Sequence, residues 1–587
     1  MINNSQTNNN NLTNTNNNAT NPYLPIKVTS LGGLDEMGKN CLVIEVENDA
    51  YVIECGLKYP TRNIPGIDSI IPDFDYIRQI QNKIRGIIIT HGHDDQYGAI
   101  SYLLQQLRAP IYCSKVTRTI IETSIGNRNH FKDHARFIDV LPSSTVNIGS
   151  HTFDFFQTTH SVADSFGFAL NTKWGNIVYT GDFMSDYSPL KGFQFDLPKV
   201  ARISEMQKTF LLIAESESAS KKGIASPNHR ITSHIKPIIE NQDGKIFISL
   251  YSQNFFNIQE VFNLAMRFNK YVVLANQEQV DFFNAMFDIK AFNFKNELLI
   301  PLSKANTVKN SSLIVLVTSN GEKLFKLCKD ICYGNVASLQ VLPEDYWINS
   351  SPSVPGTEII YTDACDTIYR TDCKVLTLTR KEISSMHAQS EDLKMMISLF
   401  RPKYYLPVKG EYRLLMENAK IAIDLGIGLN HFNTFVFDNG MQLAFDKDGN
   451  ASRKINTIKC GDVMVDGSSV GDVKEQAIVE RQKMADGGIV IIGVTISSKI
   501  KKIVSSPDIQ MRGFLYLKDN EQLLAKMSEL LNSIITTFLG ANHFSTLDAE
   551  KKASDKLFKM IVKETGKEPA VLVKILDIDY LGQVNEK

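Results

Sequence analysis

The sequence has few of the features that mark secreted or membrane-bound proteins. Its eight cysteines, at positions 41, 55, 113, 328, 332, 365, 373 and 460, follow no paired spacing and form no CxxC motif. This pattern excludes a disulfide scaffold and is typical of reduced, buried thiols. No apolar run approaches the roughly 18 residues that span a bilayer, and no basic segment followed by an apolar stretch and a cleavage site stands near the start. We therefore expect a cytoplasmic protein with no membrane partner.

The chain also lacks an excess of charge of either sign. It has 63 Lys and Arg against 64 Asp and Glu, which gives a formal net charge of −1. A nearly neutral protein exerts no long-range attraction on a polyanion. If the partner is a nucleic acid, the positive charge that binds it must be gathered locally in a groove.

The chain of 587 residues is too long for one hydrophobic core, because domains stop growing near about 250 to 300 residues. Eleven Asn in the first 21 positions predict a disordered tail with nothing apolar to bury. From Ile26 onward, short β runs alternate with helix-like segments, which indicates an α/β fold. The pattern changes divide the chain into a tail (1–22), a first α/β part (23–226), a second α/β block (227–375), a third part (376–450), a polar linker (451–459) and a small α+β unit (460–587).

The sharpest chemical feature is the run THGHDDQYGA, in which His91 and His93 directly follow the buried strand RGIIIT. Two His at i and i+2 on a loop that leaves a strand can place both imidazoles on one cation, and neutral imidazole suits Zn²⁺. His160 in TTHS, Asp182 in TGDF and His387 in SMHA follow further predicted strands. Any one of these could arise by chance, but their shared position at strand ends predicts a metal centre.

With these residues identified, the sequence resembles the ribonuclease J family, a β-CASP branch of the metallo-β-lactamase fold. The resemblance implies a metallo-β-lactamase αββα sandwich formed by 23–226 and 376–450, an inserted β-CASP α/β domain at 227–375, and a small α+β C-terminal domain at 460–587 that takes part in dimerisation. The runs that carry the resemblance are GIIITHGHDDQYGAISYLL, TTHSVADSFGFAL, TGDF, SEDLKMM, LPVKGEYRLL, VDGSSVGDV and SPDIQMRGFLYL.

Enzymes of this family use two metal ions to activate water and to clamp the scissile phosphate for in-line displacement. The resemblance implies that His91, His93 and His160 hold the first ion and that Asp182 bridges to the second. All four ligands are present. We therefore expect one intact site, occupied by Zn²⁺ or alternatively by Mn²⁺.

The second site departs from the family. Asp95 would hold the second ion with two His, but this sequence has Gln96 and Lys409 at those positions. A Gln offers a neutral carbonyl oxygen, and a protonated Lys offers no acceptor, so a normal second site is not expected. The Lys409 ammonium could take the ion's place and supply charge to the phosphate or to Asp95. Alternatively, the site has drifted out of use and Lys409 is solvated or paired with a carboxylate.

Four other positions bear on catalysis and binding. The family's Asp after the second strand is Glu54, and the acidic residue of its SDS segment is Glu215; each keeps its charge but extends its reach by about 1.5 Å, one C–C bond. In YSQNFF the resemblance implies that Asn254 contacts nucleotide. Phe256 replaces a nucleotide-contacting His there, and either stacks on a base or packs in the core, which we favour.

The family's phosphate-binding loop, SGHAS, corresponds here to SMHAQ at 385–389. Met386 replaces a Gly that lets backbone approach the nucleotide closely, so it narrows the pocket. Ser384, Ser385 and His387 can still donate to a phosphate. We expect these four residues to bind substrate, and we expect Asp95, Asp182, Lys409 and Glu215 to act in catalysis.

Two functions from different classes follow. The first is an RNA-processing and decay enzyme, a 5′-to-3′ exoribonuclease and endoribonuclease that hydrolyses single-stranded RNA with weakened activity. The second is a catalytically silent RNA-binding subunit that pairs with an active ribonuclease J. Either protein could form a homodimer or a hetero-oligomer with a paralogue. Hydrolysis of a lactam or thioester is disfavoured by the β-CASP insertion, although the fold alone does not exclude it. The sequence leaves open DNA against RNA as substrate.

Overall fold

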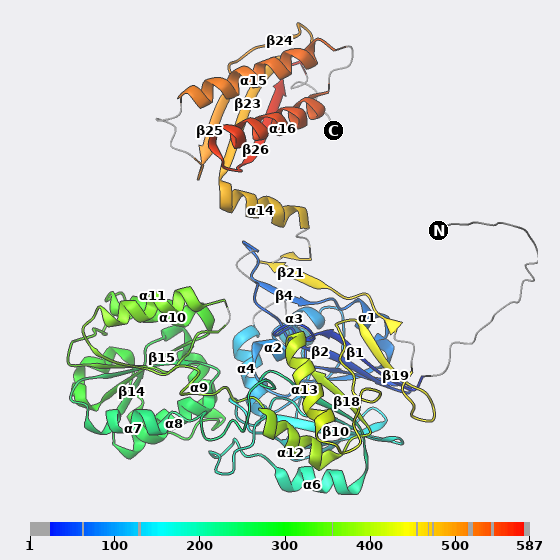
Figure 1. Cartoon of the computed structure of the whole chain (residues 1–587). Coiled ribbons are helices and arrows are strands. Elements are labelled where there is room, and N and C mark those ends of the chain that lie inside the picture. The colour runs from blue at the N-terminus through cyan, green and yellow to red at the C-terminus, as the bar shows by residue number, and fades with distance from the viewer. Residues whose placement is uncertain are drawn as a thin grey trace, which may run out of the picture. The chain divides into compact units, whose positions relative to one another are not determined.

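The computed structural model describes residues 24–60, 64–126, 131–354, 356–452, 456–467, 469–471, 475–514, 521–541 and 545–579 (Figure 1). The predicted disordered tail, residues 1–22, lies outside this part of the chain. The fold divides into two compact units. The first comprises the chain up to Leu57 together with Pro72–Gly461, and the second comprises Lys58–Ile71 together with the chain from Asp462.

Two facing β-sheets form the centre of the first unit. Apolar side chains of both sheets, such as Ile44 and Ile53 of one and Phe168 and Ile213 of the other, meet in a single buried cluster. The first sheet has the strand order β20-β19-β1-β2-β3-β5-β6-β7 and the second the order β18-β12-β11-β10-β9-β8. The first comprises β1 (Ile26–Gly32), β2 (Cys41–Val46), β3 (Asp49–Ile53), β5 (Ile84–Ile88), β6 (Ile111–Cys113), β7 (Phe137–Asp139), β19 (Met441–Phe445) and β20 (Asn456–Thr457); the second comprises β8 (Thr145–Ile148), β9 (His151–Gln157), β10 (Phe166–Thr172), β11 (Gly175–Tyr179), β12 (Thr209–Glu215) and β18 (Tyr404–Val408).

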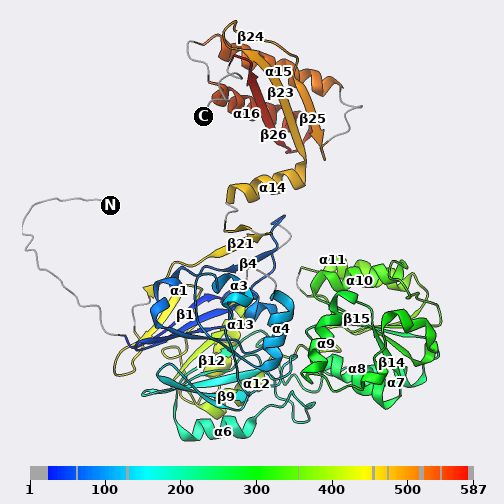
Figure 2. The same ribbon diagram turned by 180° about the vertical axis from the view of Figure 1, so that it is seen from behind.

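Helices cover the outer faces of this sandwich (Figures 1 and 2). On the second sheet, Val200, Leu393 and Ala422 of three different helices pack against Val178 and Leu212 of the strands. These three helices are α6 (Leu197–Met206), α12 (Ser390–Phe400) and α13 (Tyr412–Asp424); those that accompany the first sheet are α1 (Asp75–Gln79), α2 (Asp94–Tyr97), α3 (Ile100–Leu103), α4 (Lys115–Ile125) and α5 (Phe131–His134). The layers confirm the αββα sandwich that the sequence predicts.

A third sheet, entirely parallel, lies between β12 and β18 in the sequence, although β12 and β18 are neighbours in the second sheet. The chain therefore leaves the sandwich after Glu215, builds a separate α/β body, and returns to the sandwich with α12 and β18. The sheet has the order β14-β15-β13-β16-β17. Its elements are α7 (Thr232–Asn241), β13 (Ile246–Tyr251), α8 (Phe255–Arg267), β14 (Tyr271–Leu274), α9 (Val280–Asp288), β15 (Leu313–Ser319), α10 (Gly321–Cys332), β16 (Tyr346–Asn349), α11 (Glu358–Tyr369) and β17 (Lys374–Thr377).

The second compact unit is built on β23, which pairs with β24, β25 and, in parallel, β26. Two helices pack on this sheet through an apolar core that includes Met527, Leu531 and Leu557. A smaller sheet, β22-β21-β4, also belongs to this unit. The elements are β4 (Ser69–Pro72), β21 (Asp462–Asp466), β22 (Ser469–Val470), α14 (Glu475–Gly487), β23 (Ile489–Ser497), β24 (Lys502–Ile503), β25 (Asp508–Arg512), α15 (Glu521–Leu539), α16 (Thr546–Thr565) and β26 (Ala570–Asp577). Within the described ranges, no helix is both long and apolar enough to cross a membrane.

The carboxyl ends of several strands meet at one edge of the sandwich. In the first sheet β3 and β5 are parallel, with Ile53 opposite Ile88. In the second sheet β11, β12 and β18 are parallel, and Glu215 lies opposite Val408. Loops that follow parallel strands emerge on the same side, which is where ligands bind in α/β folds. This register brings residues that are far apart in the sequence to one place.

Candidate metal centre

Three imidazoles converge at this edge. His91 and His93 lie in the loop between β5 and α2, and His160 lies in the loop after β9. His91 Nε2 is 3.1 Å and His160 Nε2 is 3.3 Å from His93 Nδ1, and one nitrogen from each ring lies within 4.8 Å of the others. Three nitrogens so placed can share one divalent ion at the usual distance of about 2.1 Å.

Neighbouring groups orient these rings. Thr90 Oγ1 donates to Glu54 and therefore accepts from His91 Nδ1, at 3.0 Å. His160 Nδ1 donates to the Met386 carbonyl at 2.8 Å. In both rings the proton on Nδ1 leaves the Nε2 lone pair facing the other imidazoles. Such outer hydrogen bonds fix the tautomer of a ligating His.

The three rings are neutral, as a metal ligand must be. Burial lowers the pKa of His91 and His160 well below the usual range, and burial lowers the pKa of His93 to about 4. Neutral imidazole keeps the lone pair that a divalent ion requires. The geometry and protonation of the three side chains therefore fit a single metal ion.

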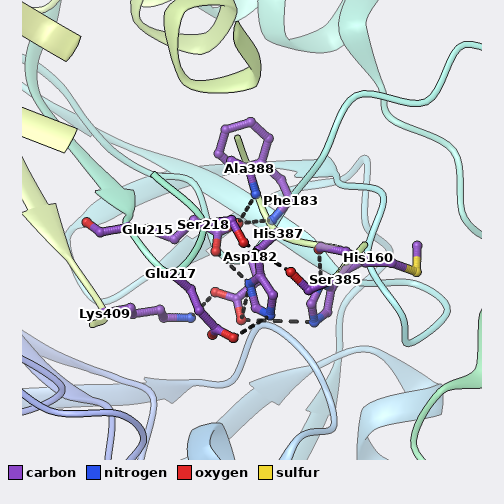
Figure 3. Close-up of polar contacts among 12 residues, drawn as sticks. His160, Asp182, Phe183, Glu215, Glu217, Ser218, Ser385, His387, Ala388 and Lys409 are labelled. Carbon is purple, nitrogen blue, oxygen red and sulfur yellow. Dashed lines mark hydrogen bonds and ion pairs between the residues drawn. The ribbon is translucent and has the colours of Figure 1, made fainter. Parts of the chain in front are cut away.

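Asp182 lies between His160 and Lys409 (Figure 3). Its Oδ2 is 3.4 Å from His91 Nε2 and 4.0 Å from His160 Nε2, while its Oδ1 accepts a hydrogen bond of 2.5 Å from Lys409 Nζ. Burial alone would raise the pKa of Asp182, but the Lys409 ammonium outweighs burial and holds it well below its usual range. Asp182 is therefore ionised, with Oδ2 toward the imidazoles and Oδ1 toward Lys409.

Lys409 is buried, and its ammonium lies 3.9 Å from Glu54 Oε1 and over the ring of Tyr179 at 5.6 Å. Burial alone would lower its pKa, but Asp182, Tyr179 and Glu54 raise it well above the usual value. Lys409 is therefore charged. The ammonium is buried against a carboxylate, so Lys409 is not simply solvated. Its ion pair with Asp182 fits both interpretations: an ammonium in the place of the ion, and a residue paired with a carboxylate in a site that has drifted out of use.

Asp95 lies on the same side as Lys409, but its partners are amides. Its Oδ2 accepts from Asn40 Nδ2 at 2.9 Å and from Gln96 Nε2 at 2.8 Å. Gln96 thus points a donor at the carboxylate, where a metal ligand would point a lone pair. Burial and the charge of Asp182 raise the pKa of Asp95 to about 8. These residues do not fit a second divalent ion.

The predicted phosphate loop lies beside the imidazoles. His387 Nδ1 is 2.7 Å from Glu215 Oε2, its Nε2 is 3.3 Å from Glu217, and its Nδ1 is 4.0 Å from Asp182. Burial opposes the charged ring, but Glu217 and Glu215 raise the pKa of His387 to about 10. Burial also raises the pKa of Glu215, to about 7. His387 is therefore a protonated group that faces the centre.

The rest of the loop is held by the protein itself. Ser385 Oγ pairs with Ser218 at 3.0 Å and with Lys221 Nζ at 3.3 Å, and Ser384 Oγ donates to the Ala225 carbonyl. Met386 is buried and turns its carbonyl toward His160. The Lys221 ammonium therefore lies beside the Ser385 hydroxyl of this loop.

The two β-CASP residues differ from the rest of the predicted set. Asn254 Oδ1 accepts from the backbone N–H of Asn257 and caps α8, so its contact with nucleotide stays a prediction. Phe256 is fully buried against Phe193 and the His229 ring, which confirms that it packs in the core. Its backbone N–H donates to Ser161 and joins α8 to the loop that carries His160.

Some neighbours of the centre carry no sequence signal. Asn40 reaches Asp95 from a loop in the N-terminal part of the chain, and Gln253 Nε2 donates to Asp94 at 3.2 Å. Glu217 and Lys221 follow the predicted Glu215 closely but belong to no recognisable motif. Gln253 lies in the run YSQNFF, but nothing in the local sequence of the other three distinguishes them from ordinary polar loop residues, and only the tertiary fold places all four here.

Comparison with protein families matches four stretches of the chain. The models that match are the metallo-β-lactamase superfamily (residues 34–193), the ribonuclease J β-CASP domain (243–368), a Zn-dependent metallo-hydrolase RNA specificity domain (376–428) and the ribonuclease J C-terminal domain (476–578). Together with the αββα layers and the His cluster, they define a metallo-hydrolase of the β-CASP type.

The relatives narrow this class to one family. Ribonuclease J 2 of Staphylococcus saprophyticus is 30% identical over 554 residues, which cover 94% of this chain and 98% of that protein. Ribonuclease J 2 of Staphylococcus aureus is 29% identical over the same coverage. The chain belongs to the ribonuclease J family. A solved structure of a protein of unknown function from Enterococcus faecalis V583 covers 72% of this chain and 100% of its own, at 15% identity and a TM-score of 0.48.

Proposed function

We propose that the protein is a metal-dependent ribonuclease of RNA processing and decay that hydrolyses phosphodiester bonds of single-stranded RNA. The 5′-to-3′ exonucleolytic and the endonucleolytic mode are both part of this proposal. One observation carries it. Three neutral, oriented imidazoles and an ionised Asp182 stand at the strand ends of a ribonuclease J fold. The matched RNA specificity domain supports RNA as the substrate.

In this proposal His91, His93, His160 and Asp182 hold one Zn²⁺ or Mn²⁺ ion. The ion, when bound, supplies a Lewis acid that activates a phosphodiester and the attacking water. The remaining residues bind and orient the substrate. Protonated His387 keeps Nδ1 on Glu215 and donates from Nε2 to a phosphate oxygen, which replaces the 3.3 Å contact with Glu217.

Lys221 and Ser385 extend this phosphate contact along the loop, because the Lys221 ammonium lies 3.3 Å from the Ser385 hydroxyl. Positive charge gathered here supplies locally what the net charge of −1 does not supply globally. Ser384 and Met386 shape the loop, and Glu215 holds His387 in place.

A second function has its own support. The place of a second ion is lined by Lys409 and by amide donors, so catalysis by two metals is not available to this chain. A silent RNA-binding subunit that assembles with an active ribonuclease J paralogue, or with a second copy of itself, is consistent with that loss. The matched ribonuclease J C-terminal domain offers a region for such assembly.

Degradation of a 5′-monophosphorylated single-stranded RNA with Zn²⁺ or Mn²⁺ separates the two functions. We expect slow degradation by the wild type and a loss of at least about 10²-fold in His91→Ala, a size typical when a catalytic ion is lost. His431→Ala, which changes an exposed His, is the matched control and should degrade RNA like the wild type. RNA binding with no degradation by any of the three proteins would overturn the enzymatic function and establish the function as an RNA-binding subunit.

A further inference from the structure

We infer that the Lys409 ammonium permanently fills the second cation position, so that the centre is built for one divalent ion and one organic cation. This inference rests on the proposed ion at His91, His93 and His160. It concerns the other side of the same centre and assigns Lys409 a positioning role on Asp182. Four observations carry it.

The first observation is that the two carboxylate oxygens of Asp182 have different partners. Its Oδ2 faces the imidazoles at 3.4 and 4.0 Å, and its Oδ1 is bound by Lys409 Nζ at 2.5 Å. A carboxylate that bridges two cations presents one oxygen to each in this way. Here the second cation is already part of the chain.

The second observation is the state of Asp95. Two amide groups, of Asn40 and Gln96, donate to the same Oδ2. If Asp95 held a divalent ion, the neighbouring ligands would turn oxygen lone pairs toward that ion. The ion would repel the partial positive charge of the amide N–H groups. Asp95 is therefore satisfied by neutral donors instead of a metal.

The third observation is the balance of charge. The buried ammonium already has Asp182 at hydrogen-bond distance and Glu54 at 3.9 Å. A divalent ion beside it would add like charge at close range in a site with little water, where electrostatic repulsion is weakly screened. Lysine and a second ion thus exclude one another.

The fourth observation concerns the backbone. Lys409 has φ of 60° and Glu54 has φ of 62°, a left-handed conformation that costs free energy for residues other than Gly and persists where the surroundings impose it. The Lys409 carbonyl accepts from Ser216, and Gly410 donates to the Gly33 carbonyl. The backbone at Lys409 is therefore held from both sides, which fixes the point from which its side chain reaches Asp182.

Metal stoichiometry of the full chain tests the inference without reference to activity. Four proteins form a matched set: the wild type, Gln96→His, Lys409→His and the double variant. Each is stripped with a chelator, reloaded with Mn²⁺, desalted and analysed by elemental analysis and native mass spectrometry. We expect one ion in the wild type and in both single variants, and two ions in the double variant alone. An exchange-coupled Mn²⁺ signal in electron paramagnetic resonance should also appear only in the double variant.

Gln96→His keeps Lys409, so it does not depend on tolerance of a change at the buried lysine. Two ions in the wild type or in Gln96→His would overturn the inference and leave the proposed function standing. A wild type that binds no ion at all would overturn the proposed function and the inference together. His91→Ala, which should bind none, shows that the single ion is the one at the imidazoles.

Discussion

Lysine and carboxylate pair in both compact units, but in opposite surroundings. In the first unit the Lys409 and Asp182 side chains are 7% and 2% exposed. In the second unit Lys526 of α15 and Glu564 of α16 are 53% and 36% exposed. Water screens the exposed pair, whereas each partner of the buried pair depends on the other for its charge. Buried charge therefore marks the unit in which chemistry is carried out.

The cores of the two units differ in the same way. The core of the second unit is a continuous apolar cluster between two helices and a sheet. Within its described residues, the buried polar side chains are those of Ser69, Ser497 and Asp577. The metal centre of the first unit instead buries or half-buries three His, several carboxylates and a Lys. The buried core of the second unit is almost wholly apolar, while the first unit concentrates costly buried charges at the metal centre, as functional sites do.

The largest effect is expected from Lys409→Met, which keeps the length of the side chain and removes its charge. Asp182 would then be a buried carboxylate without its closest cation, and breaking a buried pair in this way costs about 4 kcal/mol. Unfolding by urea in the presence of a chelator, followed by tryptophan fluorescence, measures this loss. Both tryptophans, Trp174 and Trp347, lie in the first unit.

The loss should shrink when the ion is restored, because the ion would still compensate the second oxygen of Asp182. It should also be insensitive to salt, since a buried pair is poorly screened. A Lys409→Met protein as stable as the wild type without metal would show that the pair contributes nothing, and the contrast between the two units would disappear.

A somewhat smaller effect is expected from Asp392→Ala, which removes a fully buried acceptor in the first turn of α12. Asp392 accepts from the backbone N–H groups of Ser185, Ala225 and Gln389, at 3.0 to 3.2 Å. Leaving these groups unpaired should cost about 3 kcal/mol in the same urea measurement.

The neighbouring Glu391→Ala is the matched control for this variant. Its exposed ion pair with Lys394 is worth less than about 0.5 kcal/mol. The loops after Asp182 and His387 both depend on Asp392, so RNA binding should fall as well. Equal stability of the two variants would contradict this account.

A third prediction concerns pH and Asp186, which accepts from Arg230 at 2.8 Å and from the Ser188 N–H at 3.1 Å. Burial would raise its pKa, but His229 and Arg230 outweigh burial and lower it. A depressed folded-state pKa contributes stability above the unfolded value near 3.9 and loses it as the pH falls toward the folded value. Asp186→Asn should therefore cost about 2 kcal/mol at pH 7.

The difference in stability between the wild type and Asp186→Asn should narrow as the pH is lowered from 5 to 3. Urea midpoints at a series of pH values measure it. A difference that stays constant over this range would show that Asp186 has no ionised role in the folded state.

These residues also show how far the sequence can predict the centre. His91, His93, His160 and Asp182 could be found because each follows a buried strand in a short motif, and the parallel register of the strands carries them to one edge. The fold class follows from the same alternation of strands and helices. Lys409 and Gln96 could be recognised as departures only because the surrounding runs resemble a family.

The contacts of these residues could not be predicted. Asn40 donates to Asp95 across the fold, and Asp392 joins three loops that are far apart in the sequence. Asn and Asp side chains occur in many loops for local reasons, so composition gives no sign of such long-range bonds. The segment Lys58–Ile71 likewise belongs with the C-terminal unit without any change of pattern at its ends.

The smallest effect on stability is expected for Lys526→Met, which breaks the exposed ion pair. The Lys526 Nζ to Glu564 Oε2 distance is 2.7 Å, close to that of the buried pair, yet water screens an exposed pair of this kind, so it contributes much less to stability than a buried pair. Lys and Met have similar helix propensities, so the substitution isolates the charge. Hydrogen–deuterium exchange of peptides from α15 and α16 measures the local stability, and any difference from the wild type should vanish in about 1 M salt, where the screening length is about 3 Å. If Lys526→Met lost as much stability as Lys409→Met, or if its loss persisted in salt, the distance between the charges would govern the strength of these pairs. Unequal losses of stability at nearly equal distances would show that burial governs it.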